Sequence, residues 1–442
     1  MKENIYDIIV VGAGTAGVVA ALQASRAGAK TLLIEKYGIP GGTITMAGVN
    51  GIGVFFACGK QIIAGIGWEL VVKTLAVEGK QPPSPEEIAH LPLQNSIRVN
   101  TALYAMICDQ QLNLADIDTL YHAMPAEVRR EENDWTLLIC TKNGLSQYRG
   151  RVLIDCTGDA NLVQIAGYNV ISQPVLQPAT YTFHLQGYDL KTLNEEKLRI
   201  AYQNAINNNL FRDEEFGWAG KDLGDRLIRL LRNHGNNAIH LCGFNASDSK
   251  GKTNLDIAGR NLILKIFRWL QSQPGFEQIE ISSIATECGV RETAVIEGKK
   301  YITVEDYEQG RFWPDALCYS FYPIDLHTCE GNGLIYRPLD HGILPTIPRG
   351  AMLPKKSSFL IAAGRHISGD REANSAFRVT ASCMAMGQAA GAMGALSAKT
   401  AKDPEELSLE SIKTLLAEHN AIIPKEKFLK RECFINSYSS RK

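Results

Sequence analysis

Three glycines near the start of the chain have the spacing that binds a diphosphate group. The sequence GAGTAG places them at Gly12, Gly14 and Gly17, after an apolar run and before a helical pattern. In a strand–turn–helix unit, the first glycine permits the tight turn, the second lets the backbone approach a diphosphate, and the third lets helix and strand pack closely. Free N–H groups at the start of the helix then bind the phosphates. The pattern predicts a dinucleotide site.

An acidic residue follows at the distance that such a site requires. Glu35 ends the next apolar run, about 20 residues after the glycines, where a carboxylate accepts a hydrogen bond from a ribose 2′-hydroxyl. An acid at this position favours an unphosphorylated ribose, so the sequence indicates FAD or NAD rather than NADP.

Local patterns predict the elements that carry these residues. Apolar and β-branched residues predict buried parallel strands over residues 5–11 and 30–35, and small apolar residues predict a helix over residues 15–27. The same run lacks the positive n-region and the uninterrupted apolar stretch of a secretory signal. No window of about 20 apolar residues occurs, so we expect no membrane span.

Two further segments favour FAD over NAD. After Glu35 the chain enters a Gly41-Gly42-Thr43 turn and an irregular, glycine-rich stretch instead of another strand–helix unit. Short strands around an Asn143-Gly144 turn then predict a β-meander over residues 119–156. Its last strand runs into Thr157-Gly158-Asp159, which we interpret as a second segment facing the cofactor.

A third segment of this kind lies near the C-terminus. The pattern predicts a strand over residues 359–363, a turn at Gly364-Arg365 and a long helix of small residues over 377–398. Glycines on this helix allow a second helix or a cofactor to lie against it, and close helix packing is the simpler interpretation. These glycines are Gly387, Gly391 and Gly394.

Composition excludes several classes of protein. The 442 residues carry a net charge of -1, which offers no basic field for nucleic acid or anionic lipid. No two of the ten cysteines are two or three residues apart, which argues against zinc ribbons, thioredoxin-like sites and most iron–sulfur sites. We expect most of the cysteines to be small core residues in a reducing cytosol, and we predict no metal site.

Together these motifs carry a resemblance to a known family. The chain resembles FAD-dependent oxidoreductases with a glutathione-reductase-type flavin fold, and more narrowly the group of heterodisulfide reductase A-like proteins. The residues that carry the resemblance are spread over most of the chain: Gly12, Gly14 and Gly17, Glu35-Lys36, Gly41-Gly42-Thr43, DCTGDANL (155–162), CGVRETAVIEG (288–298), YPIDLH (322–327), TIPRGAMLP (346–354) and AAGRHISGDREANSAFRV (362–379).

The resemblance implies FAD as the cofactor and a place for each part of it. Glu35 would bind the AMP ribose, the backbone of Val128 would contact adenine, and the turn at 41–43 would lie near the flavin. The segments 157–159 and 364–365 would flank the ribityl chain and the diphosphate. The implied set is Gly12, Ala13, Gly14, Thr15, Ala16, Gly17, Glu35, Lys36, Gly41, Gly42, Thr43, Val128, Thr157, Gly158, Asp159, Gly364, Arg365, Ala373 and Arg378.

The chain also departs from the family pattern. Where it has Asp370-Arg371-Glu372 and Asn374, other relatives carry histidine and small residues, so histidine-based chemistry does not transfer from them to these positions. Some relatives hold [4Fe–4S] clusters, and the missing close cysteine spacing argues against a cluster here.

The expected fold is α/β, with a Rossmann-like FAD-binding domain of parallel sheet and β-meander and an inserted α+β substrate domain. We predict domain limits at 1–166 and 337–442 for the two parts of the FAD-binding domain, and 167–336 for the substrate domain. No second G-x-G-x-x-G follows a strand, which argues against a built-in NAD(P)H module. The sequence does not identify the partner that exchanges electrons with the flavin, which could be oxygen, a quinone, another protein or the substrate alone.

Three arginines and two histidines are candidates for catalysis. Arg378, with the N-terminus of the 377–398 helix, would favour the negative charge that develops at the flavin N1–C2=O2 edge. Arg291 or Arg371 would bind a substrate carboxylate, and His327 or His366 would act as general acid or base. Each side chain also has a structural interpretation: an ion pair for Arg378, for example, and a packing device for the VRETAVIEG segment with its Glu292.

The predicted function is that of a cytoplasmic FAD-dependent oxidoreductase that transfers hydride between flavin N5 and a small molecule, with no nucleic-acid or membrane partner. Three alternatives stay open: a flavoprotein of cofactor biosynthesis, a flavoprotein of RNA modification, and an electron-carrying subunit of a larger complex with a redox partner protein. Thiazole synthases and tRNA-modifying flavoproteins share the dinucleotide turn, but the neutral charge argues against RNA.

Overall fold

The computed structural model describes residues 5–84, 87, 97–218, 222 and 224–426. Within these residues, seven strands form the main sheet in the order β7-β2-β1-β10-β9-β8, with β20 paired to β10. The pairs β7–β2, β2–β1, β1–β10 and β10–β20 are parallel, as predicted for a Rossmann-like sheet. The strands are β1 Ile5–Val11, β2 Thr31–Ile34, β7 Asp118–Leu120, β8 Met124–Glu131, β9 Asp134–Thr141, β10 Gly144–Asp155 and β20 Leu360–Ala362.

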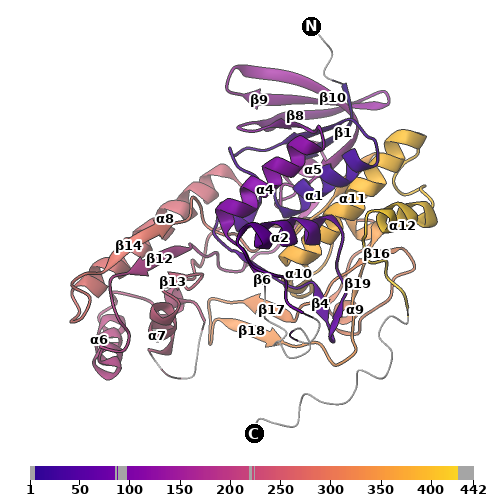
Figure 1. Cartoon of the computed structure of the whole chain (residues 1–442). Coiled ribbons are helices and arrows are strands. Elements are labelled where there is room, and N and C mark those ends of the chain that lie inside the picture. The colour runs from indigo at the N-terminus through magenta and orange to yellow at the C-terminus, as the bar shows by residue number, and fades with distance from the viewer. Residues whose placement is uncertain (1–4, 85–86, 88–96, 219–221, 223, 427–442) are drawn as a thin grey trace.

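The predicted β-meander is confirmed. β8, β9 and the first half of β10 pair antiparallel, and β10 then continues into the parallel part of the sheet. Figure 1 shows this meander standing away from the helices, at the top of the view. One long strand therefore connects both halves of the domain and ends at the Thr157 turn.

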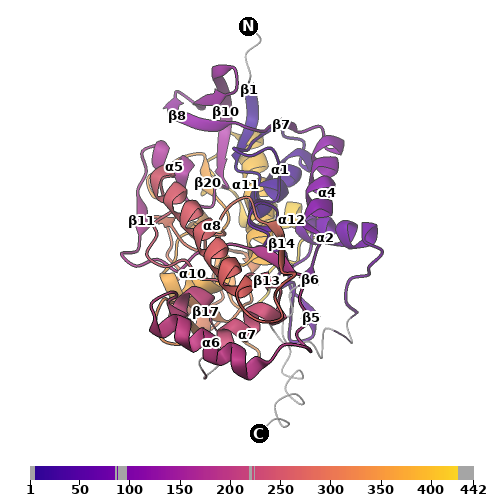
Figure 2. The same cartoon turned by 90° about the vertical axis from the view of Figure 1, so that its left-hand side faces the viewer.

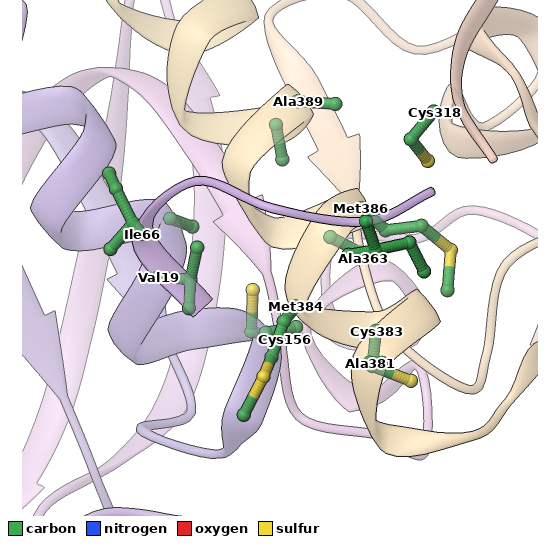
Figure 3. Close-up of a cluster of buried hydrophobic side chains, with 14 of the residues drawn as sticks. Val19, Ile66, Cys156, Cys318, Ala363, Ala381, Cys383, Met384, Met386 and Ala389 are labelled. Carbon is green, nitrogen blue, oxygen red and sulfur yellow. The ribbon is translucent and has the colours of Figure 1, made fainter. Parts of the chain in front are cut away.

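Two helices with small side chains pack closely beside the sheet. α1 (Thr15–Arg26) and α11 (Thr380–Thr400) approach so closely that a Cβ on Gly387 would lie 2.2 Å from the Ala16 carbonyl oxygen. A Cβ on Gly391 would lie 2.3 Å from the Ala20 oxygen. Figure 3 shows Val19 of α1, Met384 of α11 and Cys156, the residue after β10, in one buried cluster. Close helix packing therefore accounts for these two glycines.

The long helix predicted over residues 377–398 is present as α11, which begins three residues later, at Thr380, and is preceded by a separate short helix. α10 (Arg371–Phe377) is capped by Asp370, whose side chain accepts a hydrogen bond from the Ala373 N–H at 2.8 Å. Arg378 ends α10, and Val379 adopts an extended conformation before α11 begins. Arg378 thus lies at a break between two helices and not in a first helical turn.

A second hydrophobic cluster forms from residues 179–288 alone. Figures 1 and 2 both show α6 and α7 of this part at the end of the molecule away from the meander. Residues from Ala294 onward return to the clusters around the main sheet. The predicted limits of 167–336 for the substrate domain stay a prediction. The elements of this part are β12 Phe183–Gln186, α6 Glu195–Asn207, η2 Asp213–Phe216, α7 Asp225–Arg232, β13 Gly235–Asn236, α8 Ser249–Gln271 and β14 Glu280–Ile284.

The remaining elements connect these parts. They are η1 Gly42–Ile44, β3 Gly51–Ile52, β4 Phe56–Ala57, β5 Lys60–Gln61, α2 Ile66–Val77, β6 Ile97–Arg98, α4 Thr101–Leu114, α5 Asn161–Ile165, β11 Val170–Ser172, β15 Ala294–Ile296, α9 Val304–Glu308, β16 Ala316–Tyr319, β17 Ile324–His327, β18 Leu334–Arg337, β19 Thr346–Pro348, η3 Arg349–Met352 and α12 Leu409–Glu418. Among the described helices, none combines the length and apolarity needed to cross a bilayer.

Most of the described cysteines are either buried or disulfide-bonded, while Cys58 is half-buried and Cys140 is exposed. Cys108, Cys156, Cys288, Cys318 and Cys383 are buried, as expected for small core residues. Cys242 and Cys329 form a disulfide across 87 residues, which the sequence analysis missed because no spacing rule identifies it. The disulfide joins the second cluster to the segment after β17.

Reduction of the Cys242–Cys329 disulfide is expected to lower the melting temperature of the protein. A cross-link that closes a loop of this length restricts the unfolded chain and stabilises the fold by about 2–4 kcal/mol. Thermal unfolding with and without a reducing agent measures the effect. In the control, the double variant Cys242→Ser/Cys329→Ser should not respond to the reducing agent, and an equal response in both proteins would contradict the prediction.

Candidate functional site

The carboxyl ends of three parallel strands lie level with one another. Val11 pairs with Asp155, and Asp155 pairs with Ala362. Because parallel strands of an open sheet end at one edge, the segments that follow them meet there. The structure thereby brings together Gly12, Thr157 and Gly364, three of the expected cofactor positions.

The glycine turn after β1 needs glycine for two different reasons. Gly12 has a φ of +100°, and a Cβ there would lie 2.4 Å from the Cys156 carbonyl oxygen. A Cβ on Gly17 would lie 1.7 Å from the oxygen of Gly12. Both positions serve the folding of the turn itself.

Gly14 differs, because the fold leaves room for a side chain there. Its φ is -70°, and a Cβ would meet only the Cα of Gly42, at 3.9 Å. The turn at 12–17 and the turn at 41–43 lie against each other, since the Gly41 N–H donates to the Ala13 oxygen at 2.8 Å. No side chain caps α1 at Gly14. The uncapped N–H groups and the bare backbone therefore fit a diphosphate.

Glu35 lies beneath this turn and already accepts two hydrogen bonds. Its Oε2 accepts from the Ala13 N–H at 2.7 Å and its Oε1 from the Tyr37 N–H at 2.9 Å, and the residue is buried. Burial raises the pKa of Glu35, although the two N–H groups act in the opposite direction. Each carboxylate oxygen keeps acceptor capacity for a ribose hydroxyl.

Replacement of Glu35 by glutamine is expected to weaken FAD binding about tenfold. An amide presents one acceptor oxygen in place of two, and one charge-assisted hydrogen bond contributes about 1.5–3 kcal/mol. Fluorescence titration of the apoprotein with FAD measures the dissociation constant, with the exposed Glu132→Gln as control. The pKa of Glu35 is raised above its ordinary value of 4.5. The affinity of the wild-type protein for FAD should therefore fall as the pH is lowered from neutral and the Glu35 carboxylate becomes protonated. An unchanged affinity in the variant would show that Glu35 does not bind the ribose.

Residues next to Glu35 tie the turn to the second cluster. Lys36 is exposed and lies over the Tyr37 ring. The Tyr37 hydroxyl donates to Glu287, whose carboxylate also pairs with Lys252 at 2.9 Å. No motif in the sequence pointed to this contact, because its members are separated by more than 200 residues.

The Thr157–Asp159 turn and Arg365 form a second connection at the sheet edge. Arg365 Nε donates to the Gly158 oxygen at 2.7 Å, and the same guanidinium pairs with Asp159 and donates to the Val290 oxygen. The Thr293 hydroxyl donates to Asp159 at 2.7 Å. Burial alone would raise the pKa of Asp159, but Arg365 and Thr293 hold it below its usual value. All three guanidinium nitrogens of Arg365 are engaged with protein, so the side chain fixes the turn.

Three expected residues occupy places that restrict their roles. His366 is completely buried, with Nε2 3.3 Å from Asp155 Oδ1, so the structure gives no support to its predicted acid–base role. The N–H of Ala373 is already bonded to Asp370. Val128 lies buried in β8, the outer strand of the meander, and its contact with adenine stays a prediction.

The other candidates for catalysis come together around a residue that sequence reasoning missed. Gln177 Oε1 accepts from Arg378 at 3.3 Å and from the His327 N–H at 3.2 Å. The Gln177 N–H donates to Glu292 at 2.9 Å, and Glu292 also accepts from Arg371 Nε at 3.1 Å. A lone glutamine carries no sequence signal, so only the fold identifies it.

His327 lies in a buried pair with His240, beside Trp218. His327 Nδ1 is 3.0 Å from His240 Nε2, and its Nε2 is 3.5 Å from Asp325 Oδ2. Burial, followed by the charge of Arg291, lowers the pKa of His327 to about 3. The imidazole is therefore neutral at pH 7, and so low a pKa makes it a weak proton acceptor as well as excluding it as a general acid.

Sequence comparisons with known proteins give one family match over most of the chain and shorter matches to individual proteins. A family model described as FAD dependent oxidoreductase matches residues 7–416 of the chain. A thioredoxin reductase of Bacillus subtilis (strain 168) is 58% identical over 41 residues, which are 9% of this chain and 13% of the relative. A chloroplastic prolycopene isomerase of Arabidopsis thaliana is 33% identical over 106 residues, 22% of this chain and 18% of the relative. The matches thus span less than a fifth of either relative.

Solved structures with weak overall similarity include two that cover most of the chain. A geranylgeranyl bacteriochlorophyll reductase-like protein from Thermoplasma acidophilum is 14% identical with a TM-score of 0.44, over 94% of this chain and 84% of that one. A flavoprotein/dehydrogenase from Cytophaga hutchinsonii is 13% identical with a TM-score of 0.43, over 93% and 82% of the two chains.

Proposed function

Because this chain belongs to the FAD dependent oxidoreductase family, we propose that it oxidises or reduces a small molecule by hydride transfer to or from flavin N5. The bound flavin supplies the hydride chemistry, and the protein supplies position and electrostatics. The observation that supports the proposal is the contact between the Gly14 and Gly42 turns at the edge where β1, β10 and β20 end.

Each segment at this edge of the sheet has a proposed role in binding FAD. The first turn of α1 binds the diphosphate, Glu35 binds the AMP ribose, and β8 at Val128 contacts adenine. The turn at 41–43 would lie near the flavin. Arg378 and the start of α11 would supply positive charge to the flavin pyrimidine, which would favour the negative charge that develops during hydride transfer.

The group around Gln177 has the proposed task of binding the substrate. His327, paired with His240, is the proposed proton acceptor for a substrate hydroxyl or amine as hydride leaves the adjacent carbon, and this task requires substrate binding to raise its low pKa. Arg371 is paired with Glu292, and this pair holds the Gln177 backbone in place. Arg371 is therefore proposed as a positioning residue.

The proposed location is the cytoplasm. The five buried cysteines fit a reducing compartment, whereas the Cys242–Cys329 disulfide is a feature more common in oxidising ones. Thiol titration of protein extracted under rapid acid quench decides between them: two blocked cysteines in cells would contradict a reducing location.

The visible spectrum of the purified protein, followed by anaerobic reduction, tests the proposed function. We expect flavin absorbance, and we expect one class in a panel of small acids, amines, alcohols and NAD(P)H to bleach it. A colourless protein that takes up no added FAD would overturn the proposal. Bleaching only in the presence of a partner protein would identify an electron-carrying subunit instead.

A further inference from the structure

Two buried arginines beside Gln177 form no direct ion pair with any of the described residues. Arg291 donates to the Pro178 oxygen at 2.6 Å and to Asn237 Oδ1 at 3.4 Å, both uncharged. Arg378 donates only to Gln177, and its Nε is buried without a hydrogen-bond partner in the described part of the chain. Arg365 and Arg371, by contrast, are each paired with a carboxylate.

The charges around these arginines do not balance. Burial lowers the pKa of Arg291, and the nearby charge of Arg378 lowers it further. Asp325 is the carboxylate that acts on both arginines, while His240 and His327 are neutral. Arg229, stacked on Trp218, adds a third positive charge. Since buried charges are costly without a counter-charge, the site is prepared for an anion that the protein itself does not provide.

An unpaired donor lies at the same place. Gln177 is 4% exposed, and its Nε2 has no partner among the described residues, although Oε1 accepts two hydrogen bonds. Buried donors in folded proteins are nearly always paired, so this N–H group points to a missing acceptor. An ionised carboxylate offers only acceptors, on two oxygens, and matches a guanidinium and a neighbouring amide donor.

We propose that the substrate of this enzyme carries a carboxylate, bound by Arg291 together with Gln177 Nε2, and this inference rests on the proposed function. Of the three positive charges of Arg291, Arg378 and Arg229, Asp325 offsets one and Arg378 is assigned to the developing charge on the cofactor, so one is left for the substrate. A single negative charge fits that balance better than a phosphate dianion. The group recognised is therefore a single carboxylate of the substrate.

Titration of the holoprotein with matched pairs of ligands tests this inference. The probes are acetate and acetamide, benzoate and benzamide, and inorganic phosphate, followed by calorimetry and by the flavin spectrum. At least one carboxylate should bind at least tenfold tighter than its amide and tighter than phosphate. Equal affinity for the two members of both pairs, or tighter binding of phosphate, would overturn the inference.

Variants assign the binding to these residues. Arg291→Gln should weaken carboxylate binding at least tenfold, whereas Arg226→Gln, a control in which the arginine is equally buried at 7% exposure, should not. Gln177→Glu places a carboxylate beside Arg378 and should abolish carboxylate binding while raising the melting temperature. If Arg291→Gln fails to fold, Gln177→Glu decides: retained binding overturns the inference.

Calorimetry separates this inference from the proposed function, because it needs no flavin signal. A yellow protein that binds no carboxylate preferentially overturns the inference alone. A colourless protein overturns the proposed function, and preferential binding of a carboxylate to it would still support an anion site at Arg291.

Discussion

Replacement of Gly14 by alanine is expected to yield a folded protein that purifies without FAD. A Cβ at Gly14 has an allowed φ and meets only the Gly42 Cα at 3.9 Å, so the fold accepts it. A diphosphate that must approach this backbone meets the methyl group instead. Loss of one or two charge-assisted hydrogen bonds costs about 1.5–3 kcal/mol each, so the dissociation constant should rise roughly a hundredfold. Fluorescence titration with FAD and circular dichroism of the apoprotein measure the two effects.

Gly28→Ala is the matched control. Gly28 has a φ of +86° and no neighbour within 4 Å of a Cβ, so alanine strains the backbone by about 1 kcal/mol without entering the cofactor site. This variant should lose some stability and keep its flavin. If Gly14→Ala retains wild-type affinity, the diphosphate does not bind at this turn.

Replacement of Arg378 by methionine is expected to make the reduction potential of the bound flavin more negative by about 30–60 mV. On the proposed placement, the guanidinium and the start of α11 stabilise negative charge at the flavin pyrimidine edge. For a two-electron couple, 30 mV corresponds to about 1.4 kcal/mol, so the shift reflects about 1.4–2.8 kcal/mol of lost stabilisation. Equilibration with a reference dye during anaerobic reduction measures the potential.

Arg349→Met removes the same charge beyond the opposite end of α11. Arg349 donates to the Pro404 and Leu407 oxygens, and the 21 residues of α11 span about 30 Å between it and Arg378. The potential of this control should stay at the wild-type value. Equal shifts in both variants would mean that Arg378 acts only through the overall charge of the protein.

The sequence was sufficient for the parts of the site that depend on local patterns. Strands 5–11 and 30–35, the glycine turn between them and Glu35 lie within about 30 residues, and each has a pattern of its own. The Asn143-Gly144 turn likewise predicted the β-meander, which the structure confirms. The register between the parallel strands then follows from their patterns, because strands that are buried on both faces allow little freedom in how they align.

Contacts between distant segments were beyond the reach of the sequence. Gln177 meets Arg378 across 201 residues and His327 across 150, and no spacing rule relates them. The His240–His327 pair and the neighbouring disulfide are each separated by 87 residues. Packing of the second cluster against the sheet domain decides all of these.

A crystal structure of the protein with FAD tests the central claim most directly. The account predicts phosphate oxygens within about 3 Å of backbone nitrogens in the first turn of α1, ribose hydroxyls at Glu35, and the flavin ring between Gly42 and Arg378. A diphosphate bound anywhere else, with the turn at Gly12–Gly17 left free, would contradict it.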